Sequence, residues 1–327
     1  MGMLSTPTDS LRRMLRAPVR PADLLMLSGT LMRSFVSACN VVRIGERQLF
    51  RKLSRFGVRS ESARLGDASV RYLEGGEGPP VVLLHGFGAS AVWQWHDQIG
   101  PLAKQHRVIV PDLLWFGGSS SKRRDFSIDH QLEVVVDLLN HLGIERADFV
   151  GISYGGIVAH ELAAIHPERV GKLAILDSPG RSYTLDDHAA MLERFAVPDV
   201  GALLVPTTPD DVQVLLELGY HKPPRTPRWV NGQVLRAMYS QFRAEKAALL
   251  DNLLTQLHTL DTRPGEVRNE TLLIWGEHDP VFPLEIGQRL QADMDGRAQL
   301  RIVERAGHAP NLEHGALVAR WLGEFFA

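Results

Sequence analysis

Cysteine, long apolar runs and a strong net charge are all scarce or missing in this sequence of 327 residues. Cys39 is the only cysteine, so no intrachain disulfide can form. The longest apolar stretch, Leu24–Val42, carries Arg33 near its centre, where a charge makes a membrane-spanning helix costly. A net charge of −2 gives no reason to expect nucleic acid or another highly charged partner. These absences exclude a disulfide-linked fold and argue against a membrane-spanning one.

The basic residues are concentrated at the N-terminus. Residues 1–60 contain eleven Lys or Arg and three Asp or Glu, a balance of +8, while the remainder has a balance of −10. Within this arm, the spacing of the apolar residues in Leu24–Val42 predicts an amphipathic helix. Such a helix either lies in the interface of an anionic membrane or packs on the globular part of the same chain. We expect a cytoplasmic protein, with peripheral membrane contact as one of the two roles of the arm.

Short apolar segments alternate with helical segments from about residue 64 onward. The apolar segments predict six buried strands: Val81–Leu84, Arg107–Pro111, Ala147–Ile152, Val170–Leu176, Thr271–Trp275 and Gln299–Val303. The segments between and after them predict five helices: Trp93–Ala103, Ile128–Leu142, Gly155–Ile165, Leu284–Ala292 and Gly315–Phe326. Strands that alternate with helices predict a mostly parallel, doubly wound sheet of the α/β class.

The alternation is interrupted between the fourth and fifth predicted strands. This gap contains three helical stretches and a proline cluster: Asp186–Phe195, Asp210–Leu218, Val230–Asn252, and Pro223, Pro224 and Pro227. A helical insertion at this point predicts a lid over the carboxyl ends of the strands, where ligands bind in such sheets. We therefore expect an N-terminal arm over residues 1–63, a core over 64–180 and 268–327, and a lid over 181–267.

The strongest chemical signal is Gly151-Ile152-Ser153-Tyr154-Gly155, which follows an apolar strand and opens a helix rich in small residues. A serine on a strand–turn–helix junction with a glycine two positions to either side is typical of a nucleophile elbow. The tight turn leaves no room for side chains at the glycine positions. The helix that follows directs its positive end toward a developing oxyanion. This context predicts Ser153 as a nucleophile.

A second glycine loop, His85-Gly86-Phe87-Gly88, follows the strand Val81–Leu84. Its glycines allow the loop to pass close to Ser153, so that the backbone N–H of Phe87 meets that of Tyr154. Two such donors directed at one point form an oxyanion hole. His85 itself is expected to form hydrogen bonds within the loop.

A nucleophilic serine needs a neutral imidazole and a carboxylate behind it. His308 lies in a loop after the last predicted strand, where the chain order serine, acid, histidine places the base. Two carboxylates compete for the acid position. Asp279 follows the fifth predicted strand and Asp177 follows the fourth, and both positions are within reach of the histidine. The loop around Asp279 favours it, and Asp177 stays as the alternative.

Metal chemistry finds little support in the sequence. His160-Glu161 resembles half of a helical zinc motif, but the second histidine is missing. We expect no metal and no cofactor.

In their order along residues 65–327, the motifs His-Gly-x-Gly, Gly-x-Ser-x-Gly, Trp-Gly-x-x-Asp and Gly-His resemble those of the α/β-hydrolase family. The resemblance implies a catalytic triad of Ser153, Asp279 and His308, with oxyanion N–H groups from Phe87 and Tyr154. Serine at position 153 separates the chain from the haloalkane dehalogenase and epoxide hydrolase branches, which carry aspartate there.

The lid sequence, including residues 205–212 and Tyr220-His221-Lys222-Pro223-Pro224, resembles that of membrane-associated monoacylglycerol lipases of this family. Those lipases also carry an apolar N-terminal anchor. Trp93 and Trp115 are candidates for the substrate pocket, and Trp93 is equally compatible with a core position. Trp115 occupies a position where relatives usually have glycine.

Three hypotheses about function follow. The first is a serine ester hydrolase that acts on lipid-like esters such as monoacylglycerols through an acyl-enzyme. The second keeps the triad in a carbon–carbon hydrolase of ring-fission diketones or in a perhydrolase. The third is an inactive binding protein on the same fold, which the complete triad and both glycine loops disfavour. Chain-length preference and oligomeric state stay open.

Overall fold

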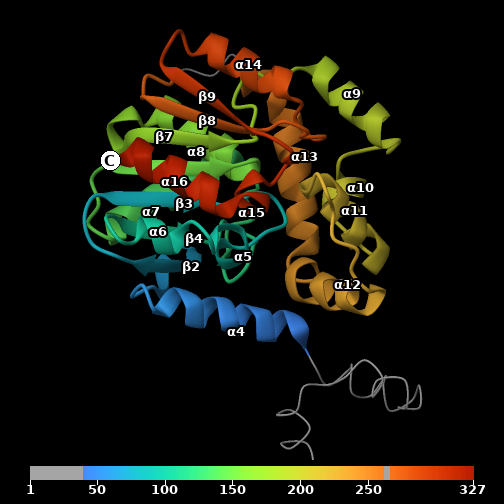
Figure 1. The fold of residues 1–327 in the computed structure, drawn as a ribbon, viewed down its shortest axis with the longest axis horizontal. Helices are drawn as coiled ribbons and strands as arrows, with labels where there is room; N and C mark the ends of the chain where they lie inside the picture. The colour runs from blue at the N-terminus through green and yellow to red at the C-terminus, as the bar shows by residue number, and fades with distance from the viewer. Residues whose placement is uncertain (1–39, 261–265) are drawn as a thin grey trace, which may run out of the picture.

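A nine-stranded sheet forms the centre of the computed structural model, which describes residues 40–260 and 266–327 (Figure 1). The strand order is β1-β2-β4-β3-β6-β7-β8-β9, and β5 pairs with β2. The bounds are β1 Arg59–Leu65, β2 Ala68–Gly75, β3 Pro80–Leu84, β4 Arg107–Pro111, β5 Ser120–Ser121, β6 Ala147–Ile152, β7 Val170–Leu176, β8 Thr271–Gly276 and β9 Ala298–Val303. Strands from β4 to β9 along this order are parallel, and β1, β2 and β5 join antiparallel. The predicted mostly parallel sheet is confirmed.

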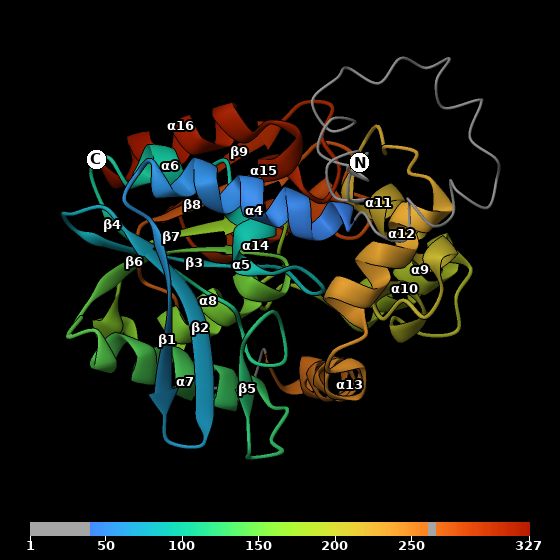
Figure 2. The same cartoon turned by 90° about the horizontal axis from the view of Figure 1, so that it is seen from below.

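Helices cover both faces of the sheet, because successive strand residues point to opposite sides. In β6, Phe149 belongs to one apolar cluster and Val150 to the other. The first cluster includes residues of α7 (Ile128–His141), α8 (Tyr154–Ile165) and α14 (Leu284–Asp293). The second includes residues of α4 (Val41–Ser54), α5 (Ala91–Trp95), α6 (Ile99–Leu102) and α16 (Gly315–Phe326), and Figure 2 shows these helices opposite α7 and α8. A parallel sheet covered on both faces requires strands that are apolar along their length, as β3 and β8 are.

The predicted insertion is helical, and it lies at one end of the sheet (Figures 1 and 2). It comprises α9 Leu185–Phe195, α10 Gly201–Leu204, α11 Pro209–Gly219, α12 Arg228–Val234, a π-helical segment Leu235–Tyr239 and α13 Arg243–Leu260. Thr184 and Thr208 begin α9 and α11 with reciprocal capping boxes. The prediction of a single helix over Val230–Asn252 is wrong. The helix is interrupted after the π-helical segment, where Phe242 adopts a positive φ of 56°.

Helix α4 packs on both the core and the lid. Leu53 is fully buried in the second apolar cluster, and a side chain on Gly45 would lie 3.0 Å from the ring of Trp93. At its N-terminal end, the Val41 N–H donates to Gln233 Oε1 of α12 at 2.8 Å. The helix predicted over Leu24–Val42 lies outside the described residues except for its last positions. Residues 41–54 and the first residues of β1, which fall within the predicted arm, therefore pack on the globular part. No helix in residues 40–260 and 266–327 is long and apolar enough to span a bilayer.

Lys246 of α13 is a buried lysine that stabilises the turn between the π-helical segment and α13. Its Nζ donates to the carbonyl oxygens of Met238 (2.7 Å) and Gln241 (3.0 Å) and lies over the rings of Phe116 and Tyr239. Only 2% of the residue is exposed. Burial, with a smaller contribution from the charge of a neighbouring arginine, lowers the pKa of Lys246 to about 8. The neutral amine still has two protons to donate, so both hydrogen bonds survive deprotonation.

This pKa predicts a pH-dependent stability. Between pH 8 and 10.5 the folded state binds fewer protons at Lys246 than the unfolded state, so its contribution to the free energy of unfolding rises with pH. Urea unfolding of the wild type and of Lys246→Met at about pH 7.5 and about pH 9.5 measures this effect. Relative to the variant, the wild type should gain about 2 kcal/mol at the higher pH. The prediction is contradicted if the free energy of unfolding of the wild type minus that of the variant does not increase between the two pH values.

Candidate active site

Ser153 sits on the turn between β6 and α8 with φ 52° and ψ −120°, a conformation that side chains rarely adopt. The glycines around it are sterically required. A Cβ on Gly151 would lie 2.3 Å from the carbonyl oxygen of Gly155, and a Cβ on Gly155 would lie 2.3 Å from that of Leu84. Both distances are far below van der Waals contact. The predicted strand–turn–helix context of Ser153 is therefore present.

The loop after β3 passes directly over this turn. A Cβ on Gly86 would lie 3.3 Å from the Cβ of Ser153. The rings of Phe87 and Tyr154 pack edge to face, with 5.9 Å between their centroids. Tyr154 is the first residue of α8, so its N–H lacks an intrahelical acceptor and lies at the positive end of the helix. The structure thus brings Phe87 and Tyr154, the two residues predicted to supply oxyanion N–H groups, together beside Ser153.

His85 holds the loop in place. Its Nδ1 lies 2.8 Å from the carbonyl oxygen of Gly86, and its Nε2 lies 2.9 Å from the N–H of Leu113. Nε2 must accept from this N–H, so Nδ1 carries the proton and the ring is neutral. Burial lowers the pKa of His85, which agrees with a neutral ring. Because both ring nitrogens are hydrogen-bonded to the backbone, His85 stabilises the loop, as expected from the sequence.

Asp279 and His308 form a hydrogen-bonded pair. Asp279 Oδ2 lies 2.9 Å from His308 Nδ1, and its Oδ1 accepts the N–H groups of Val281 (2.7 Å) and Phe282 (3.1 Å). A carboxylate acceptor places the proton of the imidazole on Nδ1 and leaves Nε2 as the basic nitrogen. Asp279 is buried and His308 is partly exposed. This is the arrangement that a base and its orienting acid need. Asp177 makes no hydrogen bond to the imidazole among the described contacts.

The loop that carries the histidine is braced by Glu313 of α15 (Pro310–Glu313) and by the lid. Glu313 accepts the N–H of Gly307 at 2.6 Å and the N–H of His221 at 3.0 Å. The N–H of Ala309 donates to the carbonyl oxygen of Gly219, the last residue of α11, at 2.9 Å. The lid and the histidine loop are therefore joined by one backbone hydrogen bond and by the carboxylate of Glu313, which accepts an N–H from each of them.

Ser153 and His308 both line a cavity of about 480 Å³ between the core and the lid. Its wall is mostly apolar and includes Leu204, Val212, Leu215, Leu216, Val234 and Met238 of the lid and Val42 of α4. No Lys, Arg, Asp or Glu is among the described residues that line it. A Cβ on Gly88 would lie 2.8 Å from the ring of Tyr239, so the lid also packs tightly on the loop after β3.

The two tryptophans predicted for the pocket have different positions. Trp93 lines the cavity, as predicted. Trp115 does not, and that expectation is corrected. Its ring is buried in the first apolar cluster against Phe126 and Phe242, at 5.6 Å from each. Its φ of 73° explains why glycine suits this position, because glycine adopts such an angle without strain.

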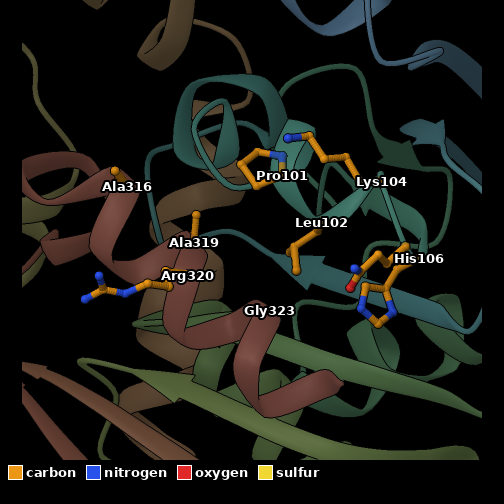
Figure 3. A pocket seen from close by; sticks show the side chains of 9 residues that line it. Pro101, Leu102, Lys104, His106, Ala316, Ala319, Arg320 and Gly323 are labelled. Carbon is orange, nitrogen blue, oxygen red and sulfur yellow. The ribbon is translucent and has the colours of Figure 1, made fainter.

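Other hollows lack this chemistry. A cavity of about 320 Å³ lies between α6 and α16 (Figure 3). It is lined by Lys104, Gln105, His106, Arg320 and small or apolar residues. Neither Ser153 nor His308 lines it. Within residues 40–260 and 266–327, no group of three or more His, Cys, Asp or Glu side chains is arranged to hold a metal ion.

Residues 79–315 match the profile of the α/β hydrolase fold family. The chain belongs to this family. It is 31% identical over 274 residues to 2-hydroxymuconate semialdehyde hydrolase of Pseudomonas sp. (strain CF600), covering 78% of this chain and 89% of that one. Two solved structures are also similar to the structure of this chain. A lipase described as putative, from Acinetobacter baumannii AYE, has a TM-score of 0.72 at 25% identity and covers 86% of this chain and 95% of its own. A bacterial membrane phospholipase A has a TM-score of 0.69 at 26% identity, and the match covers 98% of this chain and 97% of the phospholipase.

Some residues of the site were not identified from the sequence. Glu313 had no motif to mark it, because its role depends on the lid residue that folds back onto it. The lid wall did carry a signal. Val212, Leu215, Leu216 and Gly219 recur at helical spacing within α11, which indicates an apolar face. The direction of that face toward Ser153 became visible only in the fold.

The Asp279–His308 pair predicts the effect of removing one charge. Asp279→Asn should lower kcat about 10⁴-fold, because the amide favours the wrong imidazole tautomer. The change is isosteric, so thermal unfolding should confirm an intact fold. Steady-state hydrolysis of a chromogenic ester measures the loss. Near-normal turnover by folded Asp279→Asn would remove Asp279 from the acid position.

Proposed function

We propose that this α/β hydrolase cleaves uncharged, lipid-like carboxylic esters such as monoacylglycerols. Ser153 attacks the ester carbonyl while His308 Nε2 takes its proton, and Asp279 stabilises the resulting imidazolium. The N–H groups of Phe87 and Tyr154 stabilise the oxyanion. His308 then protonates the leaving alcohol and later activates the water that releases the acyl group.

The cavity wall carries this proposal. The Pseudomonas relative at 31% identity is named for a muconate, a substrate with a carboxylate. A buried carboxylate needs a cation or several hydrogen-bond donors, since an isolated buried charge is costly. No Lys or Arg is among the described residues lining the cavity, and its lid side is aliphatic apart from Tyr220 and Tyr239. These features favour an uncharged substrate with an apolar chain.

A chain-length series tests the proposal. With nitrophenyl esters from acetate upward, kcat/KM should rise about three- to fourfold per added methylene until the cavity is filled, because each buried CH₂ contributes about 0.8 kcal/mol. A monoacylglycerol should be hydrolysed, and a 2-hydroxy-6-oxo-dienoate should be a poor substrate. Ser153→Ala should lose about 10⁶-fold in kcat.

The same assays separate the competing functions. Efficient cleavage of the dienoate with weak ester turnover would favour the ring-fission hydrolase reading that the Pseudomonas relative supports. Absence of both activities, together with no labelling by a fluorophosphonate probe, would favour an inactive binding protein.

We further propose that the enzyme docks on anionic membranes through α4 and the adjoining end of the lid. Arg43, Arg47 and Arg51 form an exposed stripe at helical spacing along α4, next to the exposed Ile44. Helix α12 lies beside α4 (Figure 1). It exposes Trp229. A basic stripe with exposed apolar side chains is typical of interfacial binding. The likeness to a membrane phospholipase along 98% of the chain supports this proposal.

Charge removal on α4 tests the docking without disturbing its packing. Converting the three stripe arginines to Gln should weaken binding to vesicles containing phosphatidylserine by more than about tenfold, because each contributes about 1 kcal/mol. The effect should shrink at high salt. Hydrolysis of a short soluble ester should change little. The matched control converts three exposed arginines elsewhere: Arg124, Arg268 and Arg320. Equal co-sedimentation of the two triple variants would contradict the docking surface.

A further inference from the structure

Asp177 is a buried carboxyl group beside the triad to which the mechanism assigns no role. It follows β7, is 0% exposed and adopts a positive φ of 40°. Its N–H donates to the carbonyl oxygen of Ile274 at 3.1 Å, and its Oδ1 accepts the N–H of Gly276 at 2.8 Å. Both partners belong to β8, the neighbouring strand. Asp177 is thus fixed at the end of the strand that leads to Asp279.

The surroundings of Asp177 are acidic. The charged groups that face it are Asp279, after β8, and Glu313, on α15. Its Oδ1 is bound to Gly276, three residues before Asp279, so the two carboxyl groups lie close together at the ends of the adjacent strands β7 and β8. Two carboxyl groups can share a hydrogen bond only when one of them carries a proton. Oδ2 of Asp177 has no N–H or O–H donor directed at it within the described part of the chain. An ionised Oδ2 would therefore be buried without compensation.

The hydrogen bonds decide which of the two carries the negative charge. Asp279 receives two backbone N–H groups and the Nδ1–H of His308, whereas Asp177 receives one N–H. Bonds donated to a carboxylate favour its ionised form. Burial raises the pKa of Asp177 well above its usual range, and the negative charge of Asp279 raises it further. The pair resembles other buried carboxyl pairs that hold one proton between them.

We propose that Asp177 is a positioning residue that stays protonated at neutral pH and donates its O–H to the carboxylate of Asp279. This role rests on the proposed function of Asp279 and His308. The neutral acid orients Asp279 toward Nδ1 without adding a second negative charge behind the imidazole. No proton leaves Asp177 during turnover. The imidazole of His308 therefore interacts with one negative charge, although two carboxyl groups lie behind it.

The pH profile of kcat/KM tests this role, because its acid limb reports protonation of the base. Asp177→Asn keeps a donor toward Asp279 and an acceptor toward Gly276 and is neutral at every pH. Its acid limb should lie within about 0.3 pH unit of the wild-type limb, since no charge is lost. If Asp177 were ionised, Asn would remove a charge near His308 and move the limb about one pH unit or more to lower pH.

A second variant separates positioning from packing. Asp177→Ala removes the donor and should lower kcat about tenfold or more, with KM less affected, because a hydrogen bond to a charged group is lost. Asp177→Asn should recover most of this loss. The exposed Asp210→Asn removes a remote charge and serves as the matched control. A limb shifted to lower pH in Asp177→Asn, or an Asn variant as impaired as the Ala variant, would overturn the proposal.

A spectroscopic measurement makes the test independent of turnover. The infrared difference spectrum between wild type and Asp177→Asn at neutral pH should contain the C=O stretch of a protonated carboxyl group, shifted in D₂O. Thermal unfolding should show that both proteins are folded. Absence of this band overturns the protonated Asp177 even if esters are hydrolysed. If the band is present and no ester is hydrolysed, only the proposed function fails.

Discussion

The site depends on one steric constraint, the absence of side chains where β6 turns into α8. A Cβ at position 151 or 155 would penetrate a backbone carbonyl oxygen at 2.3 Å. Because the turn is this tight, the loop after β3 can approach to a few ångströms of Ser153, and His85 then holds that loop through both ring nitrogens. The strained φ of Ser153 is maintained by the sheet and the helix on either side of it. The strained backbone thus holds the Ser153 side chain in one fixed orientation.

The polar groups and the apolar surface of the site occupy opposite sides of the histidine. Behind the imidazole lies the carboxylate of Asp279, which accepts the Nδ1–H of His308 and two backbone N–H groups of the loop after β8. In front of it lies a cavity whose described wall has no acidic or basic side chain apart from histidine. Apolar, low-dielectric surroundings strengthen the interactions of the oxyanion and the imidazolium. The same surroundings make a charged substrate costly to bind.

Features set by local sequence were predictable, and features set by distant contacts were not. The strands Arg107–Pro111, Ala147–Ile152 and Val170–Leu176 were predicted to the residue, because buried parallel strands are nearly continuous apolar runs. The antiparallel strands β1 and β2 escaped prediction, since their outward residues are polar. Ser153 was identifiable from its glycines together with the apolar strand before it and the helix after it. Trp115 was misplaced, because its positive φ and its packing on the lid residue Phe242 follow from tertiary contacts. The sequence favoured Asp279 over Asp177 from its loop, and the structure shows a hydrogen bond from His308 to Asp279.

The hydrogen bond from Ala309 to Gly219, with Glu313 joining both sides, ties the lid to the chain segment that holds the base. Lids are the parts of such enzymes that vary to suit new substrates, because loops tolerate change better than the sheet. Here the end of α11 cannot be exchanged alone. A transplanted lid would have to reproduce a carbonyl group and an N–H group at the right places, or the histidine would lose two of its supports. Residues 219–221 and 307–313 therefore form a single structural module, although almost ninety residues separate them in the chain.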